Sequence, residues 1–168
     1  MPEFKKKVCL IGSFAVGKTS LIRRFVSGVF SDEYLTTLGV KVDQKTVTLE
    51  GREVLLLVWD LAGSDQFAKV QQAYLAGSSG FLFVADGTRK STLDDVVEEA
   101  EGILKLFPVV SISFLINKVD LAEEWEVTEE RISELKERYP VRLTSALTGD
   151  EVEETFLSLA REMVEVSR

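Results

Sequence analysis

The 168-residue sequence contains no histidine, a single cysteine and only three prolines. Without histidine, the chain can build neither a histidine-ligated metal site nor a Ser-His or Cys-His nucleophile, which excludes several classes of hydrolase. The one cysteine, Cys9, has no partner for an intramolecular disulfide, so a reducing compartment is favoured. Its apolar neighbours Val8 and Leu10 indicate a small core residue.

Long apolar runs and an excess of basic charge are also missing. No run approaches the roughly 20 residues that span a bilayer, and the first seven residues are too short and polar for a signal peptide. We therefore expect a cytoplasmic protein. With 20 basic against 28 acidic residues and a formal net charge of −8, we expect no nucleic-acid partner. The last residues, 166–168, contain no cysteine, so we expect no lipid anchor: the protein is soluble, or the chain is a truncated form.

The apolar pattern indicates an α/β fold. At 45% apolar residues, residues 1–168 suffice for one domain with a full core. Strand-like runs alternate with helical patterns, which predicts a six-stranded, mostly parallel sheet with helices on both faces. The hairpin 40–59, with its turn at Glu50-Gly51-Arg52, adds one antiparallel edge strand. About five helices are expected: 18–26, 67–75, one from a Ser91 or Thr92 cap to about 107, one ending near 139, and 150–166.

Residues 12–19, with the sequence GSFAVGKT, fit the spacing G-x-x-x-x-G-K-[ST] and follow a strand-like run. Glycines at these positions let the backbone curl with its N–H groups inward, and the helix that begins near Lys18 adds its positive end. A polyphosphate would sit in this nest, with the Lys18 ammonium against the outer phosphates and the Thr19 hydroxyl on Mg²⁺. The alternative is a glycine-rich turn without a ligand.

Three further polar clusters follow apolar strands, at 60–63 (DLAG), 117–120 (NKVD) and 144–146 (TSA). The carboxyl ends of parallel strands share one edge of a sheet, where ligands collect. In this order and spacing the four clusters resemble those of the small GTPases of the Ras superfamily, and residues 34–40 with the following strand are similar to the Rab-type branch. The resemblance covers essentially the whole chain. It implies a P-loop NTPase three-layer sandwich that binds GTP or GDP with Mg²⁺ and signals through two switch segments, 30–39 and 60–75.

The resemblance also implies roles for individual residues. Thr37 rather than its neighbour Thr36 matches the threonine that closes over Mg²⁺ and the γ-phosphate. The alternatives are a helix N-cap for Asp60 and a core anchor for Phe30. The implied catalytic residues are Lys18, Thr37, Gly63 and Ser64, and the implied magnesium ligands are Thr19, Thr37 and Asp60. The implied nucleotide contacts are Ser13, Phe14, Ala15, Val16, Gly17, Lys18, Thr19, Ser20, Phe30, Tyr34, Thr37, Gly63, Asn117, Lys118, Asp120, Ser145, Ala146 and Leu147.

The implied base is guanine. A carboxylate at Asp120 accepts from the N1–H and the 2-amino group of guanine, and adenine offers neither donor. A site that reads a base through paired hydrogen bonds can reject the wrong analogue by about 10⁴ to 10⁵. By the same resemblance, Asn117 braces residues 12–19, the phosphate loop. The stem of Lys118 covers one face of the guanine ring, and the Ala146 N–H donates to guanine O6.

The sequence departs from the family pattern in ways that predict slow turnover. Ser64 stands where the family has the glutamine that orients the attacking water, and its hydroxyl is too short for that task; Asp65 or Gln66 are the alternatives. Phe14 replaces a small residue and should hinder an arginine finger, which is worth about 10³ to 10⁵ in rate. Leu147 replaces a lysine next to the base. We expect a long-lived GTP state.

Two other function classes remain open at this point. One is an ordinary P-loop ATPase or kinase, against which Asp120 argues. The other is a pseudo-GTPase that binds nucleotide with little or no turnover, which Ser64 and Phe14 favour. For the leading interpretation, a GTP-binding switch, we expect a monomer whose partners are effector proteins, a nucleotide-exchange factor and a GTPase-activating protein.

Overall fold

The computed structural model describes residues 2–26, 34–35, 40–61 and 72–166, and within them a three-layer α/β sandwich. The sheet has the order β2-β3-β4-β1-β5-β6-β7. Its strands are β1 (Phe4–Ile11), β2 (Tyr34–Leu35), β3 (Lys41–Leu49), β4 (Arg52–Asp60), β5 (Gly80–Asp86), β6 (Ser111–Asn117) and β7 (Val141–Thr144). The helices are α1 (Lys18–Val26), α2 (Gln72–Leu75), α3 (Lys90–Leu106), the 3₁₀ helix η1 (Val119–Glu124), α4 (Glu129–Lys136) and α5 (Val152–Val166).

The predicted fold is confirmed: within the described residues, six strands of the sheet are mostly parallel, one of them is antiparallel, and five α-helices accompany them. β1 pairs in parallel with β4 and β5, and β6 pairs in parallel with β5 and β7. The hairpin β3–β4 turns at Glu50 and Gly51, whose φ angles of 50° and 82° are those that a two-residue turn demands. The structure adds the two-residue strand β2 outside β3, so the sheet has seven strands.

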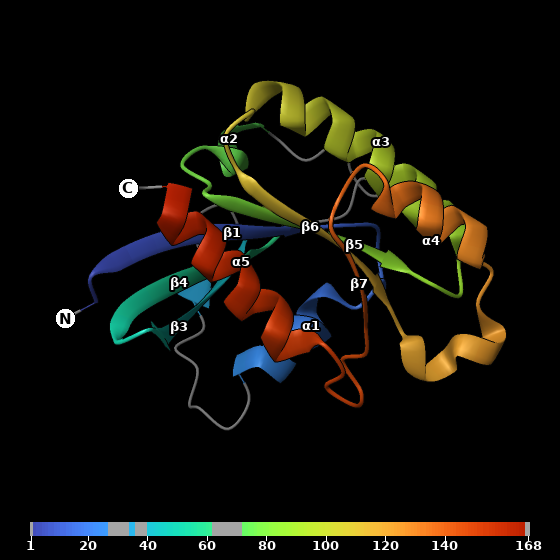
Figure 1. The fold of residues 1–168 in the computed structure, drawn as a ribbon, viewed down its shortest axis with the longest axis horizontal. Helices are drawn as coiled ribbons and strands as arrows, with labels where there is room; N and C mark the ends of the chain where they lie inside the picture. Colours follow the sequence, from blue (N-terminus) through green and yellow to red (C-terminus); the bar gives the residue numbers. More distant parts are fainter. Residues whose placement is uncertain (1, 27–33, 36–39, 62–71, 167–168) are drawn as a thin grey trace.

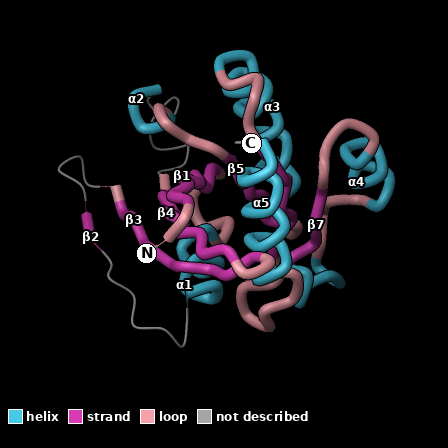
Figure 2. Tube along the Cα trace, turned by 60° about the vertical axis from the view of Figure 1, so that its left-hand side comes forward, coloured by secondary structure: helices cyan, strands magenta, loops and turns pink. Residues whose placement is uncertain are grey.

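The sheet separates two apolar cores, because successive side chains of a strand point to opposite faces. Val8 and Leu10 of β1 pack with α1 and α5, whereas Cys9 and Ile11 pack with α2, α3 and α4. Figure 1 and Figure 2 show these helices on the two sides of the sheet. On the first side, the rings of Phe25 in α1 and Phe156 in α5 stack at 4.0 Å between centroids. The two cores hold the strand ends in fixed positions, which matters for the site.

The start of α3 differs from the sequence prediction. A cap at Ser91 or Thr92 was expected, but the N-cap is Arg89, which makes no side-chain capping hydrogen bond. Thr92 lies inside the first turn, where its hydroxyl donates to the Arg89 carbonyl at 2.7 Å and accepts from the Asp86 N–H at 2.8 Å. The capping prediction is therefore wrong, because this threonine bonds backward to the strand end rather than forward to the helix.

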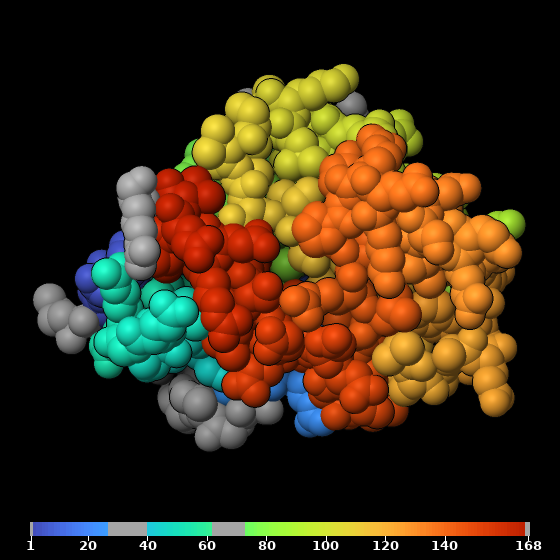
Figure 3. Space-filling model, viewed as in Figure 1, coloured from blue at the N-terminus to red at the C-terminus, as the bar shows by residue number. Residues whose placement is uncertain are grey.

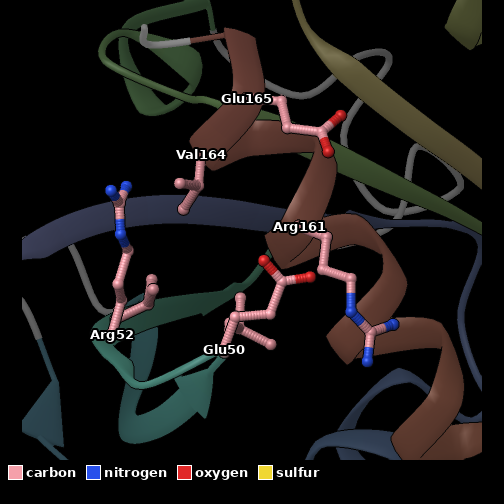
Figure 4. A pocket seen from close by; sticks show the side chains of 7 residues that line it. Glu50, Arg52, Arg161, Val164 and Glu165 are labelled. Atoms are coloured by element: carbon pink, nitrogen blue, oxygen red, sulfur yellow. The ribbon is translucent and has the colours of Figure 1, made fainter.

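Both ends of the described chain lie at the end of the sheet where the parallel strand β1 begins. Phe4 begins β1 beside Val54, and the last turn of α5 lies against the β3–β4 turn, as the chain ends marked in Figure 1 and the surface in Figure 3 show. A hollow between that turn and α5 is lined by Leu49, Glu50, Arg52, Val54, Arg161, Val164 and Glu165. The two arginines there point in different directions (Figure 4), so they do not converge on one ligand.

Among the described residues, no helix is both long enough and apolar enough to cross a bilayer.

Candidate functional site

The loop 12–17 joins β1 to α1, and two of its positions require glycine. A Cβ at Gly12 would lie 2.3 Å from the carbonyl oxygen of Val84 in β5. Gly17 has a φ of +107°, and a Cβ there would lie 2.2 Å from the Asn117 side-chain nitrogen. The loop backbone is thus pressed against β5 on one side and against the end of β6 on the other.

The first turn of α1 brings a buried cation and a hydroxyl to this loop. The Lys18 ammonium donates to the Gly12 carbonyl at 3.0 Å, so the side chain folds back over the loop that precedes it. The Thr19 hydroxyl donates to a carboxylate oxygen of Asp60, the last residue of β4. The Ser13 hydroxyl is buried and has no hydrogen-bond partner among the described residues. The loop therefore offers a cation, paired oxygen groups and an unsatisfied polar atom in one place.

Asn117, the last residue of β6, ties the loop to the next strand end. Its side-chain N–H donates to the Val16 carbonyl at 3.0 Å, and its side-chain oxygen accepts from the Thr144 hydroxyl at 3.0 Å. The side chain is buried, so water competes little for these bonds. One amide thereby fixes the phosphate loop, the end of β6 and the end of β7 relative to one another.

Asp120 is held by the segment that follows β7. The Ser145 hydroxyl donates to Asp120 Oδ1 at 2.6 Å, and the Thr148 N–H donates to the Ser145 hydroxyl at 3.0 Å. Because these bonds orient the carboxylate, Asp120 presents its oxygens from a fixed position. The neighbouring Leu147 is exposed.

Hydrogen bonds therefore connect all four polar clusters that the sequence singled out, at 12–19, Asp60, 117–120 and 144–146. Of the other residues with expected roles, Ser20 follows Thr19 in α1 and Ala146 packs partly buried against the core. Phe14 is 61% exposed. The remaining expectations concern Phe30, Thr36, Thr37, Gly63, Ser64 and the Tyr34 side chain, which lie outside the described residues.

Sequence reasoning missed Asp86, the last residue of β5. Its carboxylate is 1% exposed and accepts from Lys118 Nζ at 2.8 Å and Arg89 Nε at 3.1 Å. Burial alone would raise the pKa of Asp86, but the bonds from Lys118, Thr88 and Arg89 outweigh it and lower the pKa. The carboxylate is therefore ionised and shares its charge between two cations. The signal was present in the sequence, since Asp86 follows a buried strand just as Asp60 does.

Arg89 and Trp125 were also missed. Arg89 Nη2 donates to the carbonyl of Phe14 in the phosphate loop at 2.7 Å. Trp125 Nε1 donates to the Lys118 carbonyl at 2.8 Å, and its ring lies so close to Gly87 that a Cβ there would be 2.1 Å away. Lys118 itself adopts a left-handed φ of 75°. The tryptophan thus supports the backbone of Lys118 while Asp86 holds its ammonium.

This set of groups fits a nucleoside polyphosphate with a divalent cation. Backbone N–H groups and an ammonium suit phosphates, and a fixed carboxylate suits a base that donates two hydrogen bonds. Thr19 and Asp60 supply adjacent oxygens, the ligand type that Mg²⁺ prefers. The described part of the chain has no cluster of three or more His, Cys, Asp or Glu residues that could hold a metal by itself. A magnesium ion would accordingly depend on few protein oxygens together with the phosphates.

Comparisons with known proteins identify relatives over nearly the full length. The Ras family profile matches residues 7–165. The chain is 35% identical to Ras-related protein Rab-30 from Homo sapiens, over 99% of this chain and 83% of that protein. It is 35% identical to Ras-related protein Rab-4 from Dictyostelium discoideum, over 95% and 80% respectively. Ras-related protein Rab-8 from Diplobatis ommata is 34% identical, over 96% and 79%.

Proposed function

Since the chain belongs to the Ras family as a Rab-like small GTPase, we propose that residues 1–168 form a single guanine-nucleotide switch domain. It binds GTP or GDP with Mg²⁺, hydrolyses GTP slowly, and signals to effector proteins through two nucleotide-dependent segments. The observation that supports this most directly is the double engagement of Asn117 with Val16 and Thr144. That one buried amide sets the phosphate loop at a fixed distance from the base-reading carboxylate, as a nucleotide requires.

At the phosphate end, the backbone N–H groups of residues 13–20 surround the α- and β-phosphates, and Lys18 places its ammonium on the outer phosphates. The ammonium already rests on the carbonyl of Gly12, so it moves only a short way to exchange a neutral acceptor for an anionic one. Thr19, Asp60 and Thr37 hold the magnesium ion. When bound, the ion neutralises charge that develops on the phosphates during transfer.

At the base end, Asp120 accepts from N1–H and the 2-amino group of guanine. The Ser145 hydroxyl donates to one carboxylate oxygen, Oδ1, which orients the group and leaves its charge in place. The Ala146 N–H meets O6, and the stem of Lys118 covers one ring face while its ammonium remains on Asp86. The exposed Leu147 adds an apolar contact at the place where the family has a lysine.

The switch itself lies in segments 30–39 and 60–75. Thr37 and the Gly63 N–H bind the γ-phosphate side, with Phe30 and Tyr34 beside the nucleotide, so loss of that phosphate releases both segments. An effector reads the ordered surface, an exchange factor opens the site, and a GTPase-activating protein is a further expected partner. Because the γ-phosphate orders both segments, partner proteins can distinguish the GTP-bound from the GDP-bound form.

Turnover is slow because the attacking water is poorly oriented. Ser64 replaces the orienting glutamine, and the exposed ring of Phe14 obstructs the approach of an arginine from a partner. The same two residues favour the second candidate function, a pseudo-GTPase that holds nucleotide without useful turnover. The two candidates differ only in the rate of phosphate release.

The deciding experiment measures the nucleotide content of the purified chain and then the turnover of loaded GTP. We expect stoichiometric guanine nucleotide, displaced by excess GDP but not by equal ATP. We expect single-turnover phosphate release over hours. No release beyond the rate of free GTP would establish the pseudo-GTPase instead, and displacement by ATP at similar concentration would contradict guanine recognition. The Lys18→Ala variant serves as the binding-deficient reference.

A further inference from the structure

In the phosphate loop, residues 12–19, Ala15 is the non-glycine residue with a positive φ angle, so the peptide between Phe14 and Ala15 is under backbone strain. Ala15 has a φ of 62°, in the left-handed region that glycine enters freely and alanine avoids. Unlike Gly12 and Gly17, this position carries a Cβ. A rotation of the peptide plane would relieve the alanine, and a contact to the Phe14 carbonyl would oppose that rotation.

Arg89 supplies that contact from the N-cap of α3. Its Nη2 donates to the Phe14 carbonyl at 2.7 Å, while its Nε donates to Asp86 Oδ2 at 3.1 Å. Asp86 is 1% exposed and Arg89 is 43% exposed, so the buried carboxylate anchors one side of the guanidinium and leaves the other for the loop. A planar guanidinium can bridge two such acceptors, and an ammonium cannot match this geometry.

The orientation of the carbonyl fixes the orientation of the next N–H. In a trans peptide the C=O and the following N–H point in opposite directions. Because Arg89 holds the Phe14 oxygen on the α3 side, the Ala15 N–H points to the other side of the loop. No acceptor for this N–H occurs among residues 2–26, 40–61 and 72–166.

We propose that Arg89 is a positioning residue of the phosphate loop, which holds the Phe14–Ala15 peptide so that the Ala15 N–H donates to a phosphate of bound GDP or GTP. This inference rests on the proposed function, since it assumes a guanine nucleotide in the loop. A peptide flip would change φ of Ala15 toward values that alanine prefers and would turn a carbonyl toward the phosphates. By opposing this flip, Arg89 keeps the Ala15 N–H, rather than the Phe14 carbonyl oxygen, directed at the negatively charged phosphates.

The test compares GDP release from the full chain and its variants, with a fluorescent GDP analogue as the probe. Loss of one charge-assisted hydrogen bond predicts about tenfold faster release from Arg89→Ala. Arg89→Lys should recover only part of this, because one ammonium cannot span Asp86 and Phe14. The matched control is Arg138→Ala, which removes an arginine that is 58% exposed and pairs with Glu101 at 3.5 Å. The control should release GDP at the wild-type rate.

A second substitution separates the peptide orientation from a general loss of charge. In the Arg89→Ala background, Ala15→Gly should slow GDP release by about threefold, because glycine accepts the positive φ without strain. The same substitution should slow GDP release less when Arg89 is present. Such non-additivity is expected of two residues that act on the same peptide. A charge effect of Arg89 alone would give equal gains in both backgrounds and would overturn the proposal.

The Ala15 amide itself provides the direct readout. In GDP-bound wild type, its proton resonance should lie downfield, as expected for an N–H bonded to phosphate, and in Arg89→Ala it should move upfield or broaden. An unshifted Ala15 resonance together with wild-type release would overturn this inference alone. A wild-type protein that binds no GDP would overturn the proposed function with it. Thermal unfolding of the nucleotide-free variants checks folding, and Arg89→Lys carries the same test if Arg89→Ala unfolds.

Discussion

Lys118 and Asp86 form an ion pair across the ends of neighbouring strands, with 2.8 Å between Nζ and Oδ2. The two residues come from segments that pair at Asp86 and Asn117, so the pair closes the gap between β5 and the loop after β6. Asp86 also binds Arg89, which contacts the phosphate loop. The segment that we propose to read the base and the proposed phosphate loop, residues 12–19, therefore share one buried carboxylate.

Asp86→Asn should destabilise the protein in a pH-dependent way. The pKa of Asp86 is lowered from 3.8, so its stabilising contribution is complete above the unfolded pKa and is lost as the pH falls through the folded pKa. Above about pH 5 we expect the variant to be less stable by about 1 to 3 kcal/mol. Urea unfolding at a series of pH values checks this. The difference from wild type should be constant from neutral pH down to about pH 5 and shrink below pH 4.

The control for that measurement is Asp95→Asn, an exposed carboxylate on α3. It should leave the free energy of unfolding within about 0.5 kcal/mol of wild type. A stability difference for Asp86→Asn that stayed constant down to pH 2 would show that the lowered pKa does not contribute.

Asp120→Asn should transfer base preference from guanine toward xanthine. An amide donor then faces a carbonyl at C2 of xanthine, and the Ser145 hydroxyl can still donate to the amide oxygen. We expect GDP affinity to fall by at least about a hundredfold, while xanthosine diphosphate becomes the better competitor. Competition between the two diphosphates measures this directly. Unchanged preference would remove Asp120 from base recognition.

Removal of magnesium should accelerate nucleotide release, and Thr19→Ala should abolish most of that dependence. The Thr19 hydroxyl bonds to Asp60, so both oxygens lie where one ion can meet them. With a chelator present, GDP release from wild type should rise by about tenfold or more, whereas the variant should release GDP fast with or without the chelator. The exposed Thr48→Ala on β3 is the control and should keep the wild-type response. A variant that still responded fully to chelation would exclude Thr19 as a ligand.

Ser64→Gln should raise the rate of GTP hydrolysis. A longer side chain with both a donor and an acceptor can orient the attacking water, and phosphoryl transfer depends mainly on such positioning. We expect about a tenfold faster single turnover at unchanged GTP affinity. Ser91→Gln, on the exposed face at the start of α3, serves as the control. Equal rates in wild type and Ser64→Gln would mean that Ser64 does not limit turnover.

The fold and the strand-end clusters could be predicted because their signals are local. An apolar run that ends in Asp60 or Asn117 gives both the strand and the position of its polar end, and parallel pairing then brings those ends together. The hairpin turn followed from Glu50 and Gly51 for the same reason. To predict these features, it is enough to know that successive side chains of a strand point to opposite faces of the sheet.

The connection from α3 to the phosphate loop could not be predicted in this way. Arg89 and Phe14 are 75 residues apart, and a flexible arginine gives no periodic signal of where its head lies. The expected cap at Ser91 or Thr92 rested on hydroxyl residues at the start of a helical apolar pattern, whereas the fold uses the Thr92 hydroxyl to bond back to Asp86 and Arg89. Asp86 belongs to none of the four polar clusters, and its place at the end of a buried strand does not by itself reveal its bonds to Lys118 and Arg89.

The start of β1 and the last turn of α5 both lie at the end of the sheet opposite the four polar clusters at 12–19, 60–63, 117–120 and 144–146. A linker fused at either of these ends would leave the opposite end of the sheet, where Asp60, Asn117 and Thr144 end their strands, unobstructed. The molecule can accordingly be captured on a sensor chip through either end, with the surface that we propose to bind nucleotide turned toward the flowing sample.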